Sequence, residues 1–213
     1  MIWDLIKKSA GDIWEELFHA VLFNIIWLAG SALIIPWPYV TFGLFFVAKD
    51  IGDGKGMKVA NFFKYGRQML KPAYIWGGIN LAIVLVVWLN IQFYASFSAG
   101  WAGIVWMFLV AMLIFWALIQ LIALAIYPRL VEPRFKLAQQ NALVIMAHRP
   151  VLVVGLVGAI LLVVIATALV YVLVFALSIV AVAIIANNFV AAAIKLELGD
   201  QPQQEPDDLS ADY

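Results

Sequence analysis

Uncharged polar side chains placed inside long apolar stretches are the residues of this chain whose chemistry could serve a function. Six of them could form a polar core within a membrane: Asn24, Thr41, Asn80, Gln120, Asn187 and Asn188. Amides and hydroxyls of this kind can line a path for an uncharged solute. They can also hydrogen-bond between neighbouring helices, at about 0.6 kcal/mol apiece. The sequence leaves both roles open and favours interhelical bonding, because that role is common in bilayers.

Groups that usually catalyse reactions are scarce. The chain holds two histidines, His19 and His148, which are too far apart to predict a metal site, and no cysteine for a thiolate ligand or nucleophile. The glycine-rich run Gly52–Gly56 is followed by Met57 and Lys58 rather than by the Lys-Ser or Lys-Thr pair of a phosphate-binding loop, so it predicts a turn. We therefore expect no catalytic, cofactor-binding or metal-binding residue and no enzymatic activity.

Three long blocks without Asp, Glu, Lys or Arg carry the polar residues: Leu17–Ala48, Pro72–Pro128 and Pro150–Ile194, of 32, 57 and 45 residues. A membrane crossing needs about 20 apolar residues, so each block exceeds one crossing. The chain is 66% hydrophobic, with a mean hydropathy of +1.01. A soluble domain would have to expose this apolar surface to water. Because the blocks are continuous rather than alternating, the sequence predicts an all-α membrane protein.

The predicted fold has six membrane helices arranged as three hairpins. The sequence places them at about 17–35, 39–51, 73–93, 101–127, 151–171 and 177–195. Pro36-Trp37-Pro38 predicts the first turn, because proline does not fit inside a straight helix. The second helix is short, roughly 20 Å at 1.5 Å per residue. An alternative with five crossings, in which 17–48 forms one long span, stays open.

Amphipathic segments lie before and between these hairpins. Residues 2–17, 55–71 and 129–149 each place apolar side chains on one helical face, which predicts interfacial helices. The second segment is basic, and four of its cations are predicted to contact lipid headgroups: Lys58, Lys64, Arg67 and Lys71. The chain thus divides into an interfacial helix at 1–16, a membrane domain at 17–198 and an acidic tail at 199–213 that is expected to be disordered.

The distribution of cations predicts the orientation. Two Lys or Arg precede the first membrane helix, six lie between the second and third, four between the fourth and fifth, and one follows the sixth, so all 13 fall on one side of a six-crossing chain. The positive-inside rule makes that side cytoplasmic, with both termini inside. The formal net charge is zero, which indicates no nucleic-acid partner, whereas anionic lipid headgroups are an expected partner.

Several short motifs resemble those of a known family. Asn24-Ile-Ile-Trp27 precedes Pro38-Tyr-Val-Thr41-Phe-Gly43 and the basic run Phe62-Phe-Lys-Tyr-Gly-Arg67, and the segments at 127–135 and 140–150 follow later. Together they resemble the YesL-like family of uncharacterised bacterial integral membrane proteins, over nearly the whole hydrophobic region. The resemblance implies several helices in a bacterial inner membrane and, by gene neighbourhood alone, an accessory role in carbohydrate uptake.

Two functional hypotheses follow. The first is a non-enzymatic accessory or scaffold protein of a carbohydrate transport or sensing system, with a transporter or sensor subunit as its partner. The second is a small transporter or channel for an uncharged solute, lined by the amides named above. The sequence places no acidic or basic residue other than His19 within the three blocks, which weighs against transport coupled to protons or ions.

Overall fold

The computed structural model describes residues 1–56, 58–97, 99–170 and 176–199, and these residues contain helices and no strand. The elements are α1 Ile2–Glu15, α2 Leu17–Ala32, α3 Trp37–Gly52, α4 Val59–Gln68, α5 Leu70–Ala95, α6 Gly100–Ile126, the 3-10 helix η1 Tyr127–Arg129, α7 Phe135–His148, α8 Pro150–Leu169 and α10 Ser178–Gly199. The predicted all-α fold is confirmed. The predicted turn at 172–176 and the acidic tail lie outside the described residues, apart from residues 176 and 199.

Four helices are long and apolar enough to cross a membrane, namely α5, α8, α10 and α6 continued through η1 to Arg129. The pair α1 and α2 passes the same test only when joined, and it bends by 88°. The structure therefore contains four candidate spans, or five if the bent pair is one span. α2 and α3 have 16 residues each, which makes them roughly 24 Å long against a hydrocarbon core of about 30 Å. Six crossings in three hairpins stay a prediction.

The turn between α2 and α3 lies where the prolines predict it. α2 ends at Ala32, and Ile34 then takes a left-handed backbone conformation with a φ of 60°. Pro38 stands in the first turn of α3, where a missing N–H breaks no helical hydrogen bond. For this reason α3 starts two residues before the predicted position. Gly54 and Gly56, both with positive φ, then form the turn predicted for the glycine-rich run.

α10 is the central helix of the packed part of the molecule. It contacts α1, α2, α3, α6 and α8, and half of its residues are buried, many of them alanines. Small residues allow helices to approach closely. Glycines do the same around α3: a Cβ added at Gly43 would stand 2.8 Å from the Phe62 carbonyl oxygen of α4, and one at Gly77 of α5 would stand 2.3 Å from Pro38. α3 is thus held tightly against both α4 and α5.

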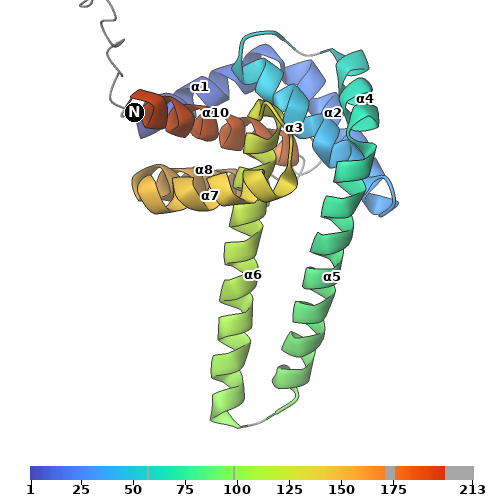
Figure 1. Ribbon diagram of the computed structural model, residues 1–213, viewed down its shortest axis with the longest axis vertical. Coiled ribbons are helices and arrows are strands. Elements are labelled where there is room, and N and C mark those ends of the chain that lie inside the picture. Colours follow the sequence, from blue (N-terminus) through green and yellow to red (C-terminus); the bar gives the residue numbers. More distant parts are fainter. Residues whose placement is uncertain (57, 98, 171–175, 200–213) are drawn as a thin grey trace, which may run out of the picture.

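α5 and α6 form a hairpin that extends away from the packed helices. Figure 1 shows the two helices running side by side to their join after Ala95, while the other helices gather at the opposite end. In this view α8 and α10 lie at a steep angle to α5 and α6, so the four long helices are not parallel. A bilayer whose normal followed α5 and α6 would have α8 and α10 lying along its plane. Six crossings would therefore require α8 and α10 to turn relative to the hairpin.

Helices α1, α4 and α7 occupy the three segments predicted to be interfacial. α4 is fastened to α3 by two tyrosines. The Tyr65 hydroxyl donates to the Asp50 carboxylate at 2.6 Å, and the Tyr39 hydroxyl donates to the Phe63 carbonyl oxygen at 3.0 Å. The hydrogen bond to Asp50, together with burial and the charge of the carboxylate, raises the pKa of Tyr65 to about 12. The fold thus has a polar seam between α3 and α4.

Candidate functional site

A cavity of about 310 Å³ lies where the packed helices meet the α5–α6 hairpin. Three of the predicted polar residues line it: Thr41 of α3, Asn80 of α5 and Gln120 of α6. Four indoles share its wall, and Phe45 and several aliphatic side chains complete it. The indoles are those of Trp27, Trp37, Trp76 and Trp116. We call this space the tryptophan cavity.

Hydrogen bonds join α5 to α6 at the wall of the tryptophan cavity. The Trp76 indole N–H donates to Gln120 Oε1 at 3.0 Å, and the Trp116 indole N–H donates to Asn80 Oδ1 at 2.9 Å. Asn80 Nδ2 donates to the Trp76 carbonyl oxygen at 2.8 Å and to Gln120 Oε1 at 3.4 Å. Each amide oxygen therefore accepts a hydrogen bond from an indole N–H of the other helix, which fixes the orientation of all four side chains.

Three pairs of residues in the wall of this cavity share one spacing in the sequence, a tryptophan followed four residues later by a polar side chain: Trp37 and Thr41, Trp76 and Asn80, Trp116 and Gln120. The same spacing at Trp3 and Lys7, Trp27 and Ser31, and Trp88 and Gln92 places no such pair in the cavity, so the spacing alone does not predict it. Residues four apart lie on one face of a helix, so each helix presents an indole and a polar group together. In α3 the Thr41 hydroxyl donates to the Trp37 carbonyl oxygen at 2.8 Å and accepts from the Trp27 indole N–H at 3.0 Å.

The wall of the tryptophan cavity is mostly apolar, with a few polar groups, and among the described residues it includes no Asp, Glu, Lys, Arg or His. Nε2 of Gln120 is buried and has no acceptor among the described residues. A buried donor in that state destabilises a fold by about 1–3 kcal/mol. An ion would lose its hydration on entering, whereas a hydroxyl can donate to the second lone pair of an amide oxygen such as Asn80 Oδ1, which accepts one described hydrogen bond. The chemistry suits a small uncharged ligand with hydroxyl groups and an apolar face.

Asn24 does not line this cavity and instead caps α10. Its Oδ1 accepts the backbone N–H groups of Ile179 at 2.9 Å and Val180 at 3.3 Å. Both belong to the first turn of α10, where a helix has no carbonyl of its own to accept them. The Asn24 side chain is fully buried. Its role is to join α2 to α10.

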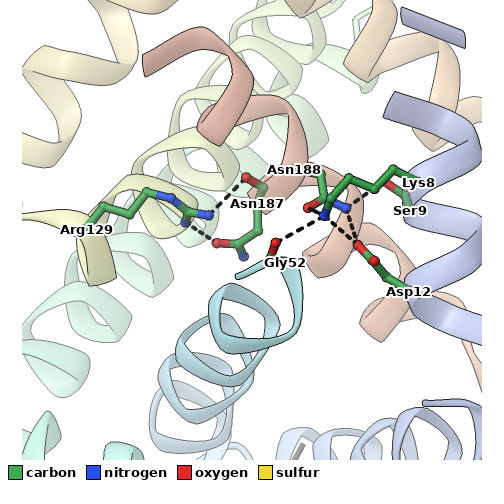
Figure 2. A network of polar contacts seen from close by, with 7 residues as sticks. All are labelled: Lys8, Ser9, Asp12, Gly52, Arg129, Asn187 and Asn188. Atoms are coloured by element: carbon green, nitrogen blue, oxygen red, sulfur yellow. Dashed lines mark hydrogen bonds and ion pairs between the residues drawn. The ribbon is translucent and has the colours of Figure 1, made fainter. Parts of the chain in front are cut away.

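Asn187 joins α10 to the end of α6. Its Oδ1 accepts from NH1 of Arg129, and its carbonyl oxygen accepts from NH2 of Arg129 at 3.2 Å. Its Nδ2 donates to the carbonyl oxygens of Ala183 at 3.0 Å and Phe45 at 3.4 Å. Figure 2 shows the guanidinium lying against this asparagine on one side of α10. Every polar atom of the amide is occupied.

Asn188, the next residue, bonds to α1 on the other side of α10 (Figure 2). Its Oδ1 accepts from Lys8 Nζ at 2.9 Å, and its Nδ2 donates to Ser9 Oγ at 3.0 Å and Asp12 Oδ2 at 2.8 Å. Lys8 also donates to the Gly52 carbonyl oxygen at 3.1 Å, so this network ties α1, α3 and α10 together. Successive residues of a helix are turned by about 100°, which directs the two amides to different neighbours.

Within the part of the chain that the structure describes, the two histidines each contact one glutamate and stand on different helices. His19 bonds Glu16 at 2.9 Å, and His148 lies 3.8 Å from Glu197, on different helices. Within the described part of the chain, no three His, Cys, Asp or Glu side chains gather where they could hold a metal ion. Asp50 accepts from the hydroxyl of Tyr65.

The four predicted headgroup contacts are exposed on α4 and at its two ends. Lys58, Lys64, Arg67 and Lys71 all reach solvent-accessible positions. Lys64 and Arg67 border a surface hollow together with the half-exposed ring of Phe63. A basic face with an aromatic ring beside it is typical of a membrane surface helix. Contact of these residues with lipid stays a prediction.

Comparisons with known proteins assign no function to this site. No protein-family model, no curated protein and no solved structure matches the chain. The YesL-like resemblance therefore stays a prediction from the motifs, and function has to be argued from the tryptophan cavity itself.

Proposed function

We propose that this protein is a non-enzymatic membrane protein that binds a small uncharged solute with hydroxyl groups, of the sugar or polyol class, in the tryptophan cavity. The observation that supports this most is the convergence of Thr41, Asn80 and Gln120 with four indoles around one uncharged space. Ligand sites are mostly apolar or aromatic with a few placed polar groups, and span roughly 300–1,000 Å³. A volume of about 310 Å³ lies at the lower end of that range and favours a small ligand.

Binding can be tested by calorimetry on detergent-solubilised protein with glycerol, xylitol, glucose and maltose. α5 supplies a matched pair of variants. Asn80 and Asn90 each donate to the carbonyl oxygen four residues earlier, both at 2.8 Å, but only Asn80 lines the cavity. We expect Asn80→Ala to weaken binding of the best ligand by about tenfold or more, with Asn90→Ala unchanged. Absence of binding for the whole panel, or equal effects of both variants, would contradict the proposal.

Flux distinguishes the two functional hypotheses. Purified protein in liposomes that carries the bound solute across the bilayer is a transporter. Protein that binds but carries no flux fits the accessory role in carbohydrate uptake, and affinity purification from native membranes should then recover a transporter or sensor subunit. We favour the accessory role, because the resemblance to the YesL-like family supports it independently of the cavity.

The proposed location is a bacterial inner membrane with both termini in the cytoplasm. Twelve of the 13 Lys and Arg lie in the packed helices or the loops that join them and Lys71 lies in the first turn of α5, whereas the uncharged join of α5 and α6 lies at the far end of the hairpin. Moving cationic segments across a bilayer is disfavoured, which supports a cytoplasmic position for the charged end.

Single cysteines test this topology, because the native chain has none. Ala10, Ile35, Ser96 and Gln140 are exposed positions on different segments. In intact cells an impermeant maleimide should label a cysteine at Ser96 and spare those at Ala10 and Gln140. Labelling at Ile35 would support a first hairpin that crosses the membrane. Protection at Ile35 with labelling at Ala10 would instead support one long first crossing, and labelling at Gln140 would contradict the orientation.

A further inference from the structure

Two adjoining cavities meet at Arg129, on the end of the molecule that carries the charges. One, of about 540 Å³, is lined by Lys49, Asp53, Arg129 and Lys195 among others. The other, of about 330 Å³, is lined mainly by aliphatic side chains. Arg129 lines both cavities, together with Ile194 and Leu198 of α10. A charged space and an apolar space thus share one wall.

The guanidinium of Arg129 is fixed in position by its backbone and amide partners. NH1 donates to the Ala125 carbonyl oxygen at 2.8 Å and to the side chain of Asn187, and NH2 donates to the Asn187 carbonyl oxygen at 3.2 Å. Figure 2 shows this side chain held against α10. Nε and one hydrogen of NH2 have no acceptor among the described residues, so the group can still bind an anion.

The charged cavity has an excess of positive charge. Lys49 pairs with Asp53 at 3.0 Å, and the same carboxylate also acts electrostatically on Arg129, whereas Lys195 forms no ion pair among the described residues. Lys195 is exposed at the mouth of the cavity. Glu197, which borders the apolar cavity, is held by Arg149 at 2.9 Å. Three cations against one carboxylate therefore face the charged space, which complements a phosphate.

The apolar cavity gives this anion site a second half. Its wall is formed by Ile126, Leu130, Val144, Ile145, Ile194 and Leu198. The candidate span of α6 ends at Arg129, which places the guanidinium where a membrane helix meets the headgroup layer. A free phosphate would use only the charged half. An amphiphile would fill both.

We propose that these two cavities form one binding site for an anionic phospholipid. Its phosphate lies between Lys49, Arg129 and Lys195, and the start of an acyl chain lies along the aliphatic wall. Burying the chain removes apolar surface from water, a favourable contribution that a phosphate ion alone cannot supply. This site is separate from the tryptophan cavity, with which it shares no lining residue.

The test uses delipidated protein in detergent and three probes, measured by calorimetry and native mass spectrometry. They are dihexanoyl phosphatidylglycerol, dihexanoyl phosphatidylcholine and inorganic phosphate. We expect the anionic lipid to bind about tenfold or more tightly than either of the others. Equal affinity for the two lipids would overturn the proposal that the charged cavity selects an anionic headgroup. Phosphate binding as tightly as phosphatidylglycerol would overturn the apolar half.

Variants locate the site without touching Arg129, whose loss would disturb α10. The double variant Lys49→Gln with Lys195→Gln should weaken the binding of phosphatidylglycerol by about tenfold or more. The matched control, Lys7→Gln with Lys136→Gln, removes two exposed cations that line neither cavity and should leave the affinity unchanged. Val144→Gln, at an exposed position on the apolar wall, should weaken binding of the lipid but not of phosphate. An equal loss in the Lys7 and Lys136 control would show binding to surface charge in general and would overturn the proposal.

Discussion

The tryptophan cavity and the asparagine pair of α10 use the same residue types in opposite ways. In the cavity, Gln120 keeps a buried Nε2 that bonds to no described residue. On α10, both Asn187 and Asn188 have every amide atom engaged, and each accepts from a cation. All of them stand in apolar helices and all bridge two helices. What separates a candidate binding site from a structural contact is the bonding capacity that packing leaves unused, not the identity of the residue.

The comparison predicts its largest effect at Asn187. Asn187→Ala removes an acceptor from the Arg129 guanidinium, and hydrogen bonds to charged groups contribute about 1.5–3 kcal/mol. We therefore expect a loss of about 2–3 kcal/mol in the free energy of unfolding, measured by denaturant titration in mixed micelles. Asn90→Ala is the control, because Asn90 is exposed and, among the described residues, bonds only to the Val86 carbonyl of its own helix.

The loss of unfolding free energy in Asn80→Ala should be smaller than in Asn187→Ala and larger than in Asn90→Ala. Asn80→Ala removes the acceptor of the Trp116 indole N–H but no hydrogen bond to a charged group. An Asn187→Ala variant as stable as Asn90→Ala would remove the distinction between the two regions. It would also remove the reason to regard Asn187 as a structural contact.

A smaller effect is expected where α3 meets α5 beside the cavity. In Gly77→Ala the new methyl would stand 2.3 Å from Pro38 Cγ, whereas a Cβ at Gly78 meets nothing within 4 Å. Overpacking of this kind destabilises by about 1–3 kcal/mol. Because Pro38 follows Trp37, the same change should also weaken solute binding in the tryptophan cavity. Gly78→Ala should leave both the unfolding free energy and the binding unchanged or slightly improved.

Gly77 and Gly78 also test the packing of α3 against α5, because the structure distinguishes the two glycines and the sequence alone does not. Both glycines suggest close helix approach when the sequence is considered alone. A result in which both variants behave alike would mean that α3 and α5 do not pack as closely as the structure shows.

The helices themselves could be predicted, because composition controls them. The segment without charged residues at 72–128 gives α5 and α6 within three residues of the predicted starts and ends. Pro36 and Pro38 locate the α2–α3 turn for steric reasons that need no tertiary information. The direction of α8 relative to α6 could not be predicted, because hydropathy reports how apolar a helix is and not the direction in which it packs.

The candidate site was predictable only in part. Thr41, Asn80 and Gln120 were recognisable as polar residues in apolar helices, but their convergence was not, because the tryptophan four residues before each of them also precedes polar residues outside the cavity, such as Gln92. The opposite assignments of Asn187 and Asn188 depend on which helix packs on each side of α10. That arrangement is a property of the whole fold, so adjacent identical residues received identical predictions.

The smallest expected effect concerns Tyr65, which extends the comparison to a fully bonded group outside the candidate spans. Its hydroxyl donates to Asp50, and this bond, with burial and the carboxylate charge, raises the pKa of Tyr65 to about 12. The ordinary tyrosine pKa is about 10. Because the folded pKa is the higher one, the contact stabilises the fold fully below pH 10, and the stabilisation is lost as the pH rises through about 12.

The difference in tyrosinate absorbance between the wild type and Tyr65→Phe should therefore titrate near pH 12. Asp50→Asn should move that titration towards the ordinary value, because it removes the charge that holds the proton. A difference titration centred near pH 10 in the wild type would show that the α3–α4 seam is not bonded as described.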